Sequence, residues 1–528
     1  MTIRGNTASV HILDSAALRN ARAQGVSRII YNYRTVEVDD DIELIQTAVY
    51  RTESLPWVYE NVANLIDGLF SRIPGLRRLE SLDWKNALYK LIYVKQMSQG
   101  QLAYAGQQQP DHLASIGFGR QSSVVGYLVA STKAFLGHCY RVFKSRRKSL
   151  MSAGAWKGRK IVYICGAPTD LWYFDNILRP FYRDMVVYVP VEFAQRWDAE
   201  HIAKLEAEGI SVVFEKSRFP RLYFTLLSPF RFSSKERWLL THFLTAVYRA
   251  RGTITSMEEL LKRGPKLVMF NAGENNYWAN IICQIARRHG CKSLNIMNGL
   301  KSGEPSDWGV EFDRWVVWDE KMRSLLVERG DIPFEVLEPI GHPAAVDISS
   351  DEMKASPSTV CLEGVSKFIP IFGRGDLDIV KIVMDRVQEL ARANPEWRFA
   401  YRPHPTDDSR ILSSVDPDLV TIVGHDANDA KTELYRLLYA ADLVVVFGST
   451  VGMEASWLGV PVISIEPWTR SHLYNVDDDN VIHCRTLGEF EQAFGSLMSQ
   501  DRGVRSTKGL PSSEVTERYI DCIRSMTC

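Results

Sequence analysis

The sequence lacks the features that mark several large classes of protein. Its 528 residues include only 8 cysteines, which show neither metal-ligand spacing nor the density of a disulfide framework. No window offers the roughly 18–20 uninterrupted apolar residues of a membrane span, and the first residues, MTIRGNTASVHILDS, hold no apolar core of a secretory signal. Basic and acidic residues balance at 63 each. We therefore expect a cytoplasmic protein with reduced thiols, without a bound metal and without nucleic acid as a partner.

The sequence does contain two series in which short apolar runs alternate with helical patterns. Apolar, β-branched runs without polar alternation are typical of strands buried on both faces of a parallel sheet. Strands are predicted in the first series at Ile161–Ile164, Met185–Val189, Ile210–Phe214, Lys266–Phe270, Ser293–Met297 and Trp315–Trp318. In the second series they are predicted at Lys367–Phe372, Arg398–Tyr401, Val420–Val423, Leu443–Phe447 and Val460–Ile465, with helices at Leu377–Ala393 and Ala430–Tyr439.

These series predict an α/β protein of two tandem Rossmann-like, doubly wound domains with a cleft between the carboxyl edges of their sheets. We expect residues 151–342 to form the first domain, residues 343–505 the second and residues 506–528 a C-terminal helix. Residues 1–150 begin like a βαβ unit, with apolar runs from Ser9 and from Ser27, and then turn mostly helical. This helical N-terminal extension is expected to belong to the first domain or to be appended to it.

The most informative stretch is DLVVVFGSTVGMEASWLGVPVISIEP, which starts at Asp442. The apolar run Leu443–Phe447 ends at Gly448, and Ser449 and Thr450 stand where a helix begins. A strand, a turn, a helix and a second strand form a βαβ unit with parallel strands, and the turn lies where α/β sheets bind ligands. Backbone N–H groups, hydroxyls and the positive end of a helix dipole make this turn a good phosphate site.

A second motif, RPHP, follows the strand predicted at Arg398–Tyr401. The two prolines, one of them Pro405, restrict the loop around His404. Its imidazole, with an ordinary pKa of about 6.5, can donate to a phosphate and, when protonated, offset the charge of a leaving group. Arg402 could bind the same phosphate. A histidine that only completes local hydrogen bonds and a solvated arginine are the alternative interpretations.

The two motifs, RPHP at one strand end and GST-xG-x-EA at another, resemble the nucleotide-binding half of GT-B glycosyltransferases that build bacterial surface polysaccharides. The likeness is strongest to capsule and O-antigen enzymes that use CMP-activated acidic sugars, the Kdo and sialic-acid transferases. In those enzymes an HP pair and a downstream Ser/Thr pair hold the nucleotide. The resemblance matches His404 and Pro405 to the first pair and Ser449 and Thr450 to the second. With Arg402, Gly448 and Glu454 they form the expected nucleotide-binding set.

Glu454 lies four residues after Thr450, on the same face of the predicted helix. Retaining members of the wider fold use such a glutamate on the ribose hydroxyls and pair it with another glutamate eight positions earlier, which is Val446 here. The resemblance therefore implies inversion. No acidic pair stands at a strand end in the second domain, so we expect transfer to need no metal. For Glu454 the alternative is an acceptor for nearby backbone N–H groups.

Inverting transfer needs a base that takes the proton of the acceptor hydroxyl. The candidates in the first domain are Asp170 and Glu274, each of which follows a predicted strand; for Asp170 the alternative is a helix N-cap. With His404 they form the expected catalytic set. Lys301 and Asn298, which follow another strand, are expected to bind the substrate, although a surface lysine is the ordinary interpretation of Lys301.

The resemblance implies transfer of a sugar, for example an acidic sugar such as Kdo or sialic acid, from a nucleotide donor to a surface glycan or its lipid-linked precursor, without a cofactor. A non-hydrolysing nucleotide-sugar 2-epimerase, a CDP-polyol phosphotransferase of the teichoic acid type and a degenerate binding module are the alternatives. The epimerases carry a Ser-Gly-Gly-to-Glu-Glu turn, whereas this chain has Ser449-Thr450-Val451-Gly452 and the single Glu454.

Two stretches combine apolar and basic residues in the manner of a membrane-surface segment. Val124–Phe143 is largely apolar and is followed by Lys144, and Phe219–Phe232 interleaves aromatic residues with arginines. Such segments suit the headgroup region of an anionic membrane. We therefore expect peripheral contact with the inner face of the cytoplasmic membrane; burial in a core or in an oligomer contact is the alternative.

Overall fold

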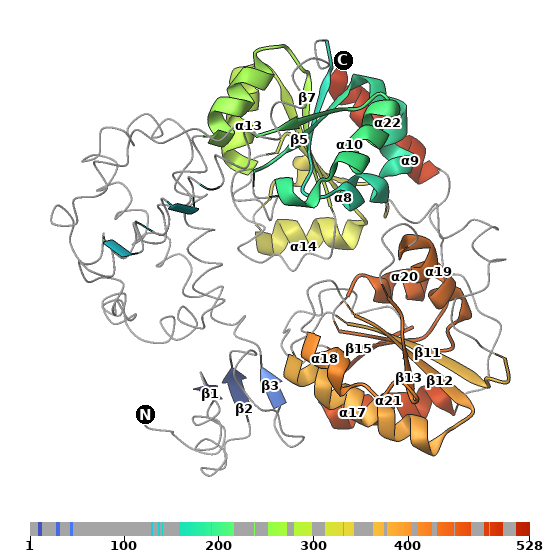
Figure 1. Ribbon diagram of the computed structural model, residues 1–528. Coiled ribbons are helices and arrows are strands. Elements are labelled where there is room, and N and C mark those ends of the chain that lie inside the picture. The colour runs from blue at the N-terminus through green and yellow to red at the C-terminus, as the bar shows by residue number, and fades with distance from the viewer. Residues whose placement is uncertain are drawn as a thin grey trace. The chain divides into compact units, whose positions relative to one another are not determined.

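The computed structural model gives two compact α/β units, shown in Figure 1. One unit spans residues 51–343 together with 513–528, and the other spans residues 1–50 together with 344–512. Before residue 158 the structure describes residues 9–12, 28–31 and 43–45 and single helical positions between 128 and 140. Beyond that point it describes residues 158–191, 193–215, 237, 252–271, 279–297, 312–330, 332–342, 363–373, 377–403, 409–424, 430–447, 449–465, 480–484, 486–499 and 514–528.

The first domain is built on a parallel sheet of seven strands in the order β10-β9-β8-β7-β4-β5-β6. The central strands are almost wholly buried, as their uninterrupted apolar runs predict, because helices cover both faces. Six of the strands fall within a residue or so of the predicted positions, and β10 was not predicted. The strands are β4 (Ile161–Ile164), β5 (Met185–Val189), β6 (Ser211–Phe214), β7 (Leu267–Asn271), β8 (Lys292–Ile296), β9 (Arg314–Val317) and β10 (Leu337–Pro339).

The helices of the first domain connect these strands as right-handed crossovers require. One begins with an N-cap at Asp198, whose carboxylate accepts a hydrogen bond from the backbone N–H of His201 at 2.8 Å. A further helical stretch, 252–261, precedes β7. The labelled helical elements between β4 and β10 are α8 (Pro168–Tyr173), α9 (Asp175–Leu178), η2 (Arg179–Asp184), η3 (Ala194–Arg196), α10 (Ala199–Ala207, the helix capped by Asp198), α13 (Ala279–Arg288), α14 (Glu320–Gly330) and η6 (Phe334–Val336).

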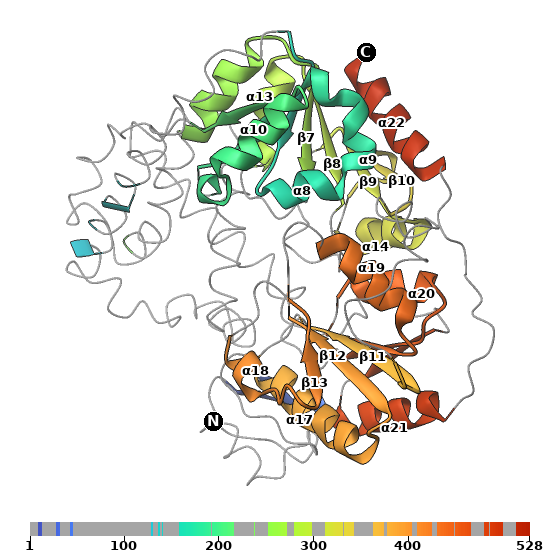
Figure 2. The same ribbon diagram turned by 45° about the vertical axis from the view of Figure 1, so that its right-hand side comes forward.

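The last helix, α22 (Glu514–Thr527), packs on this first domain although the whole second domain precedes it in the sequence. In Figure 2 it lies beside α9. The hydroxyl of Tyr519 donates to the carbonyl of Gly341 at 2.9 Å, and Arg518 Nη2 donates to the carbonyl of Pro339 at 2.7 Å. The helix predicted for this C-terminal segment therefore completes the first core, through Val515, Tyr519, Cys522, Ile523 and Met526.

The second domain repeats the plan with six parallel strands in the order β13-β12-β11-β14-β15-β16. Inward-facing residues alternate along each strand, so that α17, α18 and α21 cover one face while α19 and α20 contact the other. The strands are β11 (Lys367–Phe372), β12 (Trp397–Arg402), β13 (Val420–Ile422), β14 (Val444–Val446), β15 (Val462–Ile465) and β16 (Val481–Cys484). The helices are α17 (Leu377–Ala393), α18 (Ser409–Ser414), α19 (Ala430–Ala440), α20 (Val451–Trp457) and α21 (Leu487–Met498).

A small third sheet stands near the N-terminus. Its strands β1 (Ser9–Ile12), β2 (Arg28–Tyr31) and β3 (Glu43–Ile45) are parallel and adjacent in that order. The first two match the two strands of the βαβ unit predicted there, and the segment between them lies outside the described residues. β3 falls at the start of the stretch expected to be helical, most of which lies outside the described residues. The two large sheets confirm the predicted fold class of two tandem doubly wound domains.

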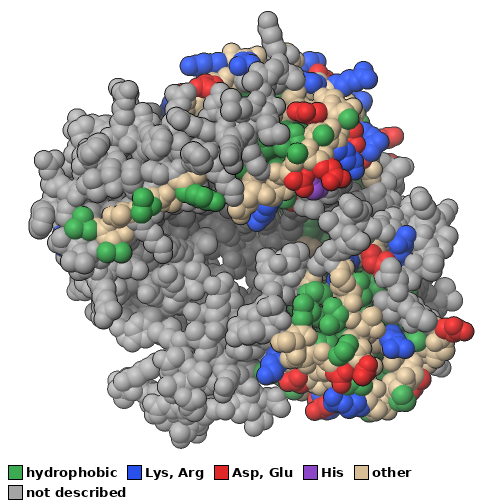
Figure 3. Space-filling model, viewed as in Figure 1, with side chains coloured by type: hydrophobic (Ala, Val, Ile, Leu, Met, Phe, Trp, Pro, Cys, Tyr) green, Lys and Arg blue, Asp and Glu red, His purple; other side chains and the backbone are tan. Residues whose placement is uncertain are grey.

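Among the residues that the structure describes, no helix is both long enough and apolar enough to cross a bilayer. Figure 3 shows acidic and basic side chains intermixed over the described surface of this face of the molecule, in keeping with the equal numbers of the two in the sequence.

Candidate functional site

Each sheet has one position where the strand order reverses. In each domain the chain first forms a middle strand, then adds strands towards one edge, and then adds the remaining strands on the other side of the first one. The order therefore reverses between β4 and β7 in the first domain and between β11 and β14 in the second. Open α/β sheets bind ligands outside the carboxyl ends of the strands at such a point. The segments that follow β4, β7, β12 and β14 supply most of the residues predicted from the sequence.

The turn after β14 lies at the reversal point of the second domain. Val446 is the last residue of β14 and is 1% exposed, so the position of the glutamate used by retaining enzymes is part of the buried strand. Ser449 Oγ accepts a hydrogen bond from the backbone N–H of Val451 at 3.4 Å. Thr450 is the N-cap of α20, but its side chain makes no capping bond. Two hydroxyls therefore stand at the start of a helix, as predicted.

Gly452 brings this helix close to the sheet. A Cβ atom at this position would lie 3.1 Å from Val446 Cγ2 and 3.3 Å from Val462 Cγ1, closer than side-chain atoms normally approach. Glycine therefore allows a close approach here, because a side chain would require the two valines or α20 to shift by a few tenths of an ångström. The close approach holds the first turn of α20 directly over the strand ends.

Two of the predicted residues meet in a buried charged group. Arg402 is the last residue of β12 and is 7% exposed, and Glu454 on α20 is 3% exposed. Burial lowers the pKa of Arg402, and the charges of Glu433 and Glu454 counteract that effect. The structure thus places Arg402 and Glu454 within electrostatic reach of each other and adds Glu433 of α19, which is 8% exposed.

Sequence reasoning missed Glu433. The residue lies in the first turn of α19, where a glutamate is ordinary because it complements the helix dipole. Its ion pair with Arg436, at 3.6 Å, also resembles a common surface pair of residues three apart on a helix. Only its burial next to Arg402, which depends on tertiary packing, distinguishes it from such a pair.

In the first domain, Asp170 follows β4 at the reversal point. The helix after β4 begins at Pro168, so Asp170 lies in its first turn and is not its N-cap. The Oδ2 atom of Asp170 accepts a hydrogen bond from the backbone N–H of Ala167 at 3.1 Å. Burial raises the pKa of Asp170, although backbone hydrogen bonds and the charge of Arg196 act in the opposite direction.

The surroundings of Asp170 explain this pKa. Cys165 precedes it in the same turn, is fully buried and donates from Sγ to the carbonyl of Ala167 at 3.1 Å. Phe193 packs near the turn and carries the guanidinium of Arg196 over its ring, 5.0 Å from the ring centre. Trp197 donates from its indole to the carbonyl of Gly166 at 3.4 Å. The carboxyl group is therefore half-buried close to two aromatic side chains, and this loss of solvent disfavours its charged form.

Several predicted residues lie outside the described residues, so their roles stay predictions. They are Glu274, Asn298, Lys301, His404, Pro405 and Gly448, as well as most of Val124–Phe143 and all of Phe219–Phe232.

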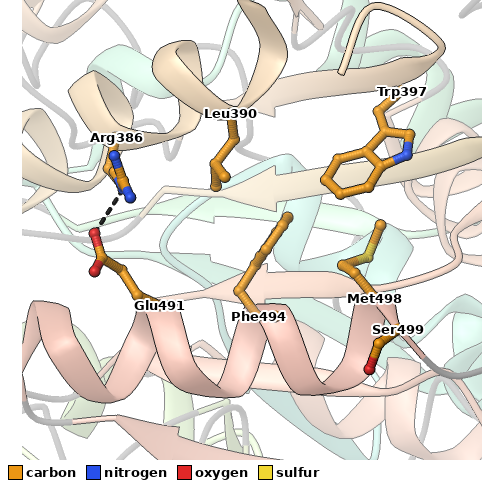
Figure 4. A pocket seen from close by; sticks show the side chains of 8 residues that line it. Arg386, Leu390, Trp397, Glu491, Phe494, Met498 and Ser499 are labelled. Carbon is orange, nitrogen blue, oxygen red and sulfur yellow. Dashed lines mark ion pairs between the residues drawn. The ribbon is translucent and has the colours of Figure 1, made fainter. Parts of the chain in front are cut away.

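The second domain also has a cavity away from these strand ends. It has a volume of about 350 Å³ and lies between α17, α21 and the start of β12. Figure 4 shows Trp397, Leu390, Phe494 and Met498 around it, with the Arg386–Glu491 ion pair at one end. It contains none of the predicted residues, and its mostly apolar lining offers little to a phosphate.

Comparison with known proteins supports the fold and leaves the activity open. No family model matches the sequence. A lipid-A-disaccharide synthase from Geobacter sulfurreducens is 24% identical over 201 residues, which is 35% of this chain and 48% of that protein, so this chain spans about half the length of the relative it matches.

Two solved structures are similar to this chain. The S. aureus protein MnaA, solved with UDP, is similar with a TM-score of 0.50 and 14% identity over 70% of this chain and 96% of that one. A UDP-N-acetylglucosamine 2-epimerase from Rickettsia bellii gives a TM-score of 0.46 and 13% identity over 70% and 97%. The likeness to the S. aureus protein and the two parallel sheets of seven and six strands together support a GT-B-type fold.

Proposed function

We propose that the protein is a glycosyltransferase that moves a sugar from a nucleotide donor bound by the second domain to a hydroxyl of a glycan acceptor. One observation carries this proposal. Arg402, the hydroxyls of Ser449 and Thr450, and Glu454 gather at the carboxyl edge of the second sheet, beside its reversal point. The partial sequence similarity to a lipid-A-disaccharide synthase is consistent with it.

The role that we propose for each residue follows from the chemistry of its side chain. The hydroxyls of Ser449 and Thr450, the N–H groups of their turn and His404 meet the negative charge of the phosphate that leaves with the nucleotide. Asp170 takes the proton of the acceptor hydroxyl, and its raised pKa makes it a stronger base than an exposed aspartate. Glu274 is the alternative base, and Lys301 and Asn298 contact the substrate.

The reaction is proposed to invert the sugar and to need neither metal nor cofactor. The buried Val446 supports inversion, because retaining enzymes carry a glutamate there. The donor sugar is proposed to be acidic, such as Kdo or sialic acid, and the acceptor a bacterial surface glycan or its lipid-linked precursor. Activity should survive EDTA; loss of activity that magnesium or manganese restores would contradict metal independence.

The nucleotide is the first quantity to measure. Among CMP, CDP, UDP and GDP, at least one should raise the melting temperature of the wild-type protein. His404→Ala and Ser449→Ala should each abolish transfer and weaken binding of that nucleotide by ~1.5–3 kcal/mol, because each removes a contact to the charged phosphate. Wild-type affinity in both variants would contradict the assignment of the site.

Activity assays distinguish the proposed transferase from the two alternative enzymes. Conversion of UDP-N-acetylglucosamine to its 2-epimer without any acceptor would favour an epimerase, and release of CMP from a CDP-polyol would favour a phosphotransferase. Glu491→Gln, which alters an ion pair away from the strand ends, is the control and should leave nucleotide binding unchanged.

We also propose that the first domain contacts an anionic membrane surface. Val129, Leu136 and Tyr140 lie at helical positions of the stretch Val124–Phe143 and are 63%, 61% and 65% exposed. Their spacing places them along one face of a helix. Exposed apolar groups followed by a basic segment that begins at Lys144 suit the headgroup region, where a lipid-linked acceptor would be found.

A further inference from the structure

The first domain has a basic cavity at the amino edge of its sheet, the edge opposite the one that carries Asp170. The cavity has a volume of about 650 Å³, which lies within the range of small-molecule sites. The start of β4, the turn before β7, part of η2 and the C-terminal end of α22, marked C in Figure 1, line it. Its cationic lining residues are Arg159, Lys160, Arg263, Lys266 and Arg524.

The cavity stays positively charged even when the nearby carboxylates are counted. The five cations stand against one acidic lining residue, Asp184, which leaves a net charge of +4. Asp521, which pairs with Arg524 at 3.4 Å, and the carboxylate that Cys528 carries here lower this charge to +2. Basic and acidic residues balance over the whole sequence, so the positive charge is a local feature that attracts anions.

Two lysines of this cavity stand side by side at the sheet edge. Lys160 precedes β4 and Lys266 precedes β7, and the backbone N–H of Lys266 donates to the carbonyl of Lys160 at 2.7 Å. In the part of the chain that the structure describes, neither ammonium group has a hydrogen-bond or ion-pair partner. Like charges on neighbouring strands repel each other. A bound anion would therefore relieve a repulsion that the fold leaves in place.

Stabilisation of a helix end is the ordinary role of cations in such a place, because the last carbonyl groups of a helix carry partial negative charge. Lys292, the first residue of β8, already has this role. Its Nζ atom donates to the carbonyl of Ser525, in the last turn of α22, at 3.4 Å. Lys160 and Lys266 make no such contact among the described residues, and they are available to a ligand.

We infer that this cavity binds the phosphate groups of a small soluble molecule. The cations come from the starts of two strands, from the turn before β7 and from α22, so several phosphate oxygens can be contacted at once. Ile161 and Phe181 also line the cavity and can contact a less polar part of the ligand. The inference does not depend on the proposed function, because the cavity and Asp170 lie at opposite ends of β4.

The test uses inorganic pyrophosphate and the full chain. Calorimetry should detect binding to the wild type with a Kd below about 1 mM. The double variant Lys160→Gln, Lys266→Gln should bind about tenfold more weakly, because it loses two exposed cation–phosphate contacts. The control Lys204→Gln, Lys321→Gln removes the same charge from exposed positions of α10 and α14 outside the cavity, and should keep the wild-type affinity.

Hydrogen exchange followed by mass spectrometry locates the bound pyrophosphate. Because Arg524 and Thr527 line the cavity, pyrophosphate should slow exchange in α22 of the wild type and not in the Lys160→Gln, Lys266→Gln variant. Ser449→Ala should keep this protection. The readout therefore separates binding in the cavity from binding of pyrophosphate at the candidate nucleotide site of the second domain.

Vesicles of phosphatidylglycerol and phosphatidylcholine test the other source of phosphate, a lipid headgroup. Equal vesicle binding by wild type and double variant, together with weaker pyrophosphate binding by the variant, supports a soluble ligand. If the wild type binds no pyrophosphate and only vesicle binding falls in the variant, the inference is overturned and the cavity is assigned to a headgroup. Unchanged pyrophosphate affinity and unchanged protection of α22 in the variant also overturn it. So does a wild type that binds neither probe and is merely more stable than the variant, because the lysines then serve the fold alone.

Discussion

At the scale of single residues, Asp170 is subject to two opposing requirements. Burial disfavours its charged form, whereas a base must be charged before it can accept a proton. For an acid whose folded-state pKa lies above its unfolded value, the contribution to stability is fully present below the unfolded pKa and is lost as the pH rises through the folded pKa. Asp170 thus destabilises the fold at neutral pH.

Asp170→Asn should therefore stabilise the protein at neutral pH, because the amide stays neutral and its oxygen can still accept from Ala167. The gain should shrink as the pH falls towards the ordinary aspartate pKa of 3.8, where the wild-type side chain is neutral too. Urea unfolding at several pH values measures this difference. A variant that is less stable than wild type at neutral pH would show that the hydrogen bond of Asp170 outweighs its desolvation.

If Asp170 is the base, the same variant should lose about a hundred- to ten-thousand-fold in kcat. In the wild type, kcat/KM should rise with pH through the raised pKa of Asp170 and then level off. A transfer rate in Asp170→Asn close to that of wild type would indicate that Glu274, and not Asp170, is the base.

At the scale of elements, two glycines in helices of the second domain have opposite steric surroundings. A Cβ on Gly452 of α20 would meet two valines of the sheet, whereas a Cβ on Gly495 of α21 would meet nothing within 4 Å. Neither has the positive φ that favours glycine. The first glycine is thus required by packing and the second is not.

Gly452→Ala should lower the free energy of unfolding by about 1–3 kcal/mol, because the added methyl overfills a close contact. Gly495→Ala should raise it by about 0.5–1 kcal/mol, since alanine is the better helix former and finds open space. Chemical denaturation of both variants measures the two effects. Equal changes in the two would mean that the contact at Gly452 relaxes without cost.

The elements that sequence reasoning located are those with long buried runs. β5, β11 and α17 match their predicted bounds, because a strand buried on both faces and a long amphipathic helix leave clear patterns. The short edge strands β10 and β16 were missed, since half-exposed residues such as Glu338 and His483 interrupt any apolar run. Edge strands carry a weaker pattern because one side of each lacks a neighbouring strand.

The residues of the candidate site could be predicted only where they lie close together in the sequence. Ser449, Thr450 and Glu454 could be found because they sit in sequence order around one turn. Glu433 could not, because only its burial and its effect on the charge of Arg402 distinguish it, and Arg402 lies about thirty residues away in the chain and on another element. A local sequence pattern gives no information on contacts between segments that lie far apart in the chain.

At the scale of the whole molecule, α22 makes the first domain discontinuous in sequence. Gly341, with φ of +129°, lies against Val515, and its carbonyl accepts from Tyr519. The helix buries five side chains in the core formed by residues 161–340. Each fully buried apolar side chain contributes about 1.5–3 kcal/mol, so their sum is comparable to the stability of a whole domain, about 5–15 kcal/mol.

A chain that ends at Ser512 should therefore fail to fold its first domain and should aggregate, while the second domain keeps its own core. Limited proteolysis followed by mass spectrometry should detect a protected fragment from the second domain alone. Arg524→Gln, at an ion pair exposed by more than half on both sides, is the control and should be stable. A truncated protein with two protected fragments would contradict this prediction.

Membrane contact is the other prediction at this scale. Binding to phosphatidylglycerol-containing vesicles should fall as salt rises, and should fall about a hundredfold when Arg146, Arg147 and Lys148 are changed to Glu, since each nearby cation contributes ~1 kcal/mol. Leu136→Ser with Tyr140→Ser should also weaken binding, whereas Phe334→Ser, which removes a side chain 55% exposed elsewhere in the domain, should not. Equal partitioning of all these proteins would rule out the proposed surface.

The position of α22 also sets the order of events during synthesis. The ribosome releases the rest of the first domain about 170 residues before it releases this helix, a delay of roughly ten to thirty seconds at about 5–20 residues per second. Throughout that delay the apolar groove that later receives Val515 and Tyr519 faces water, while the six-stranded sheet of the second domain, whose strands lie between Lys367 and Cys484, can already form. We therefore expect chaperones to bind the nascent first domain, because its apolar groove stays exposed until α22 is released.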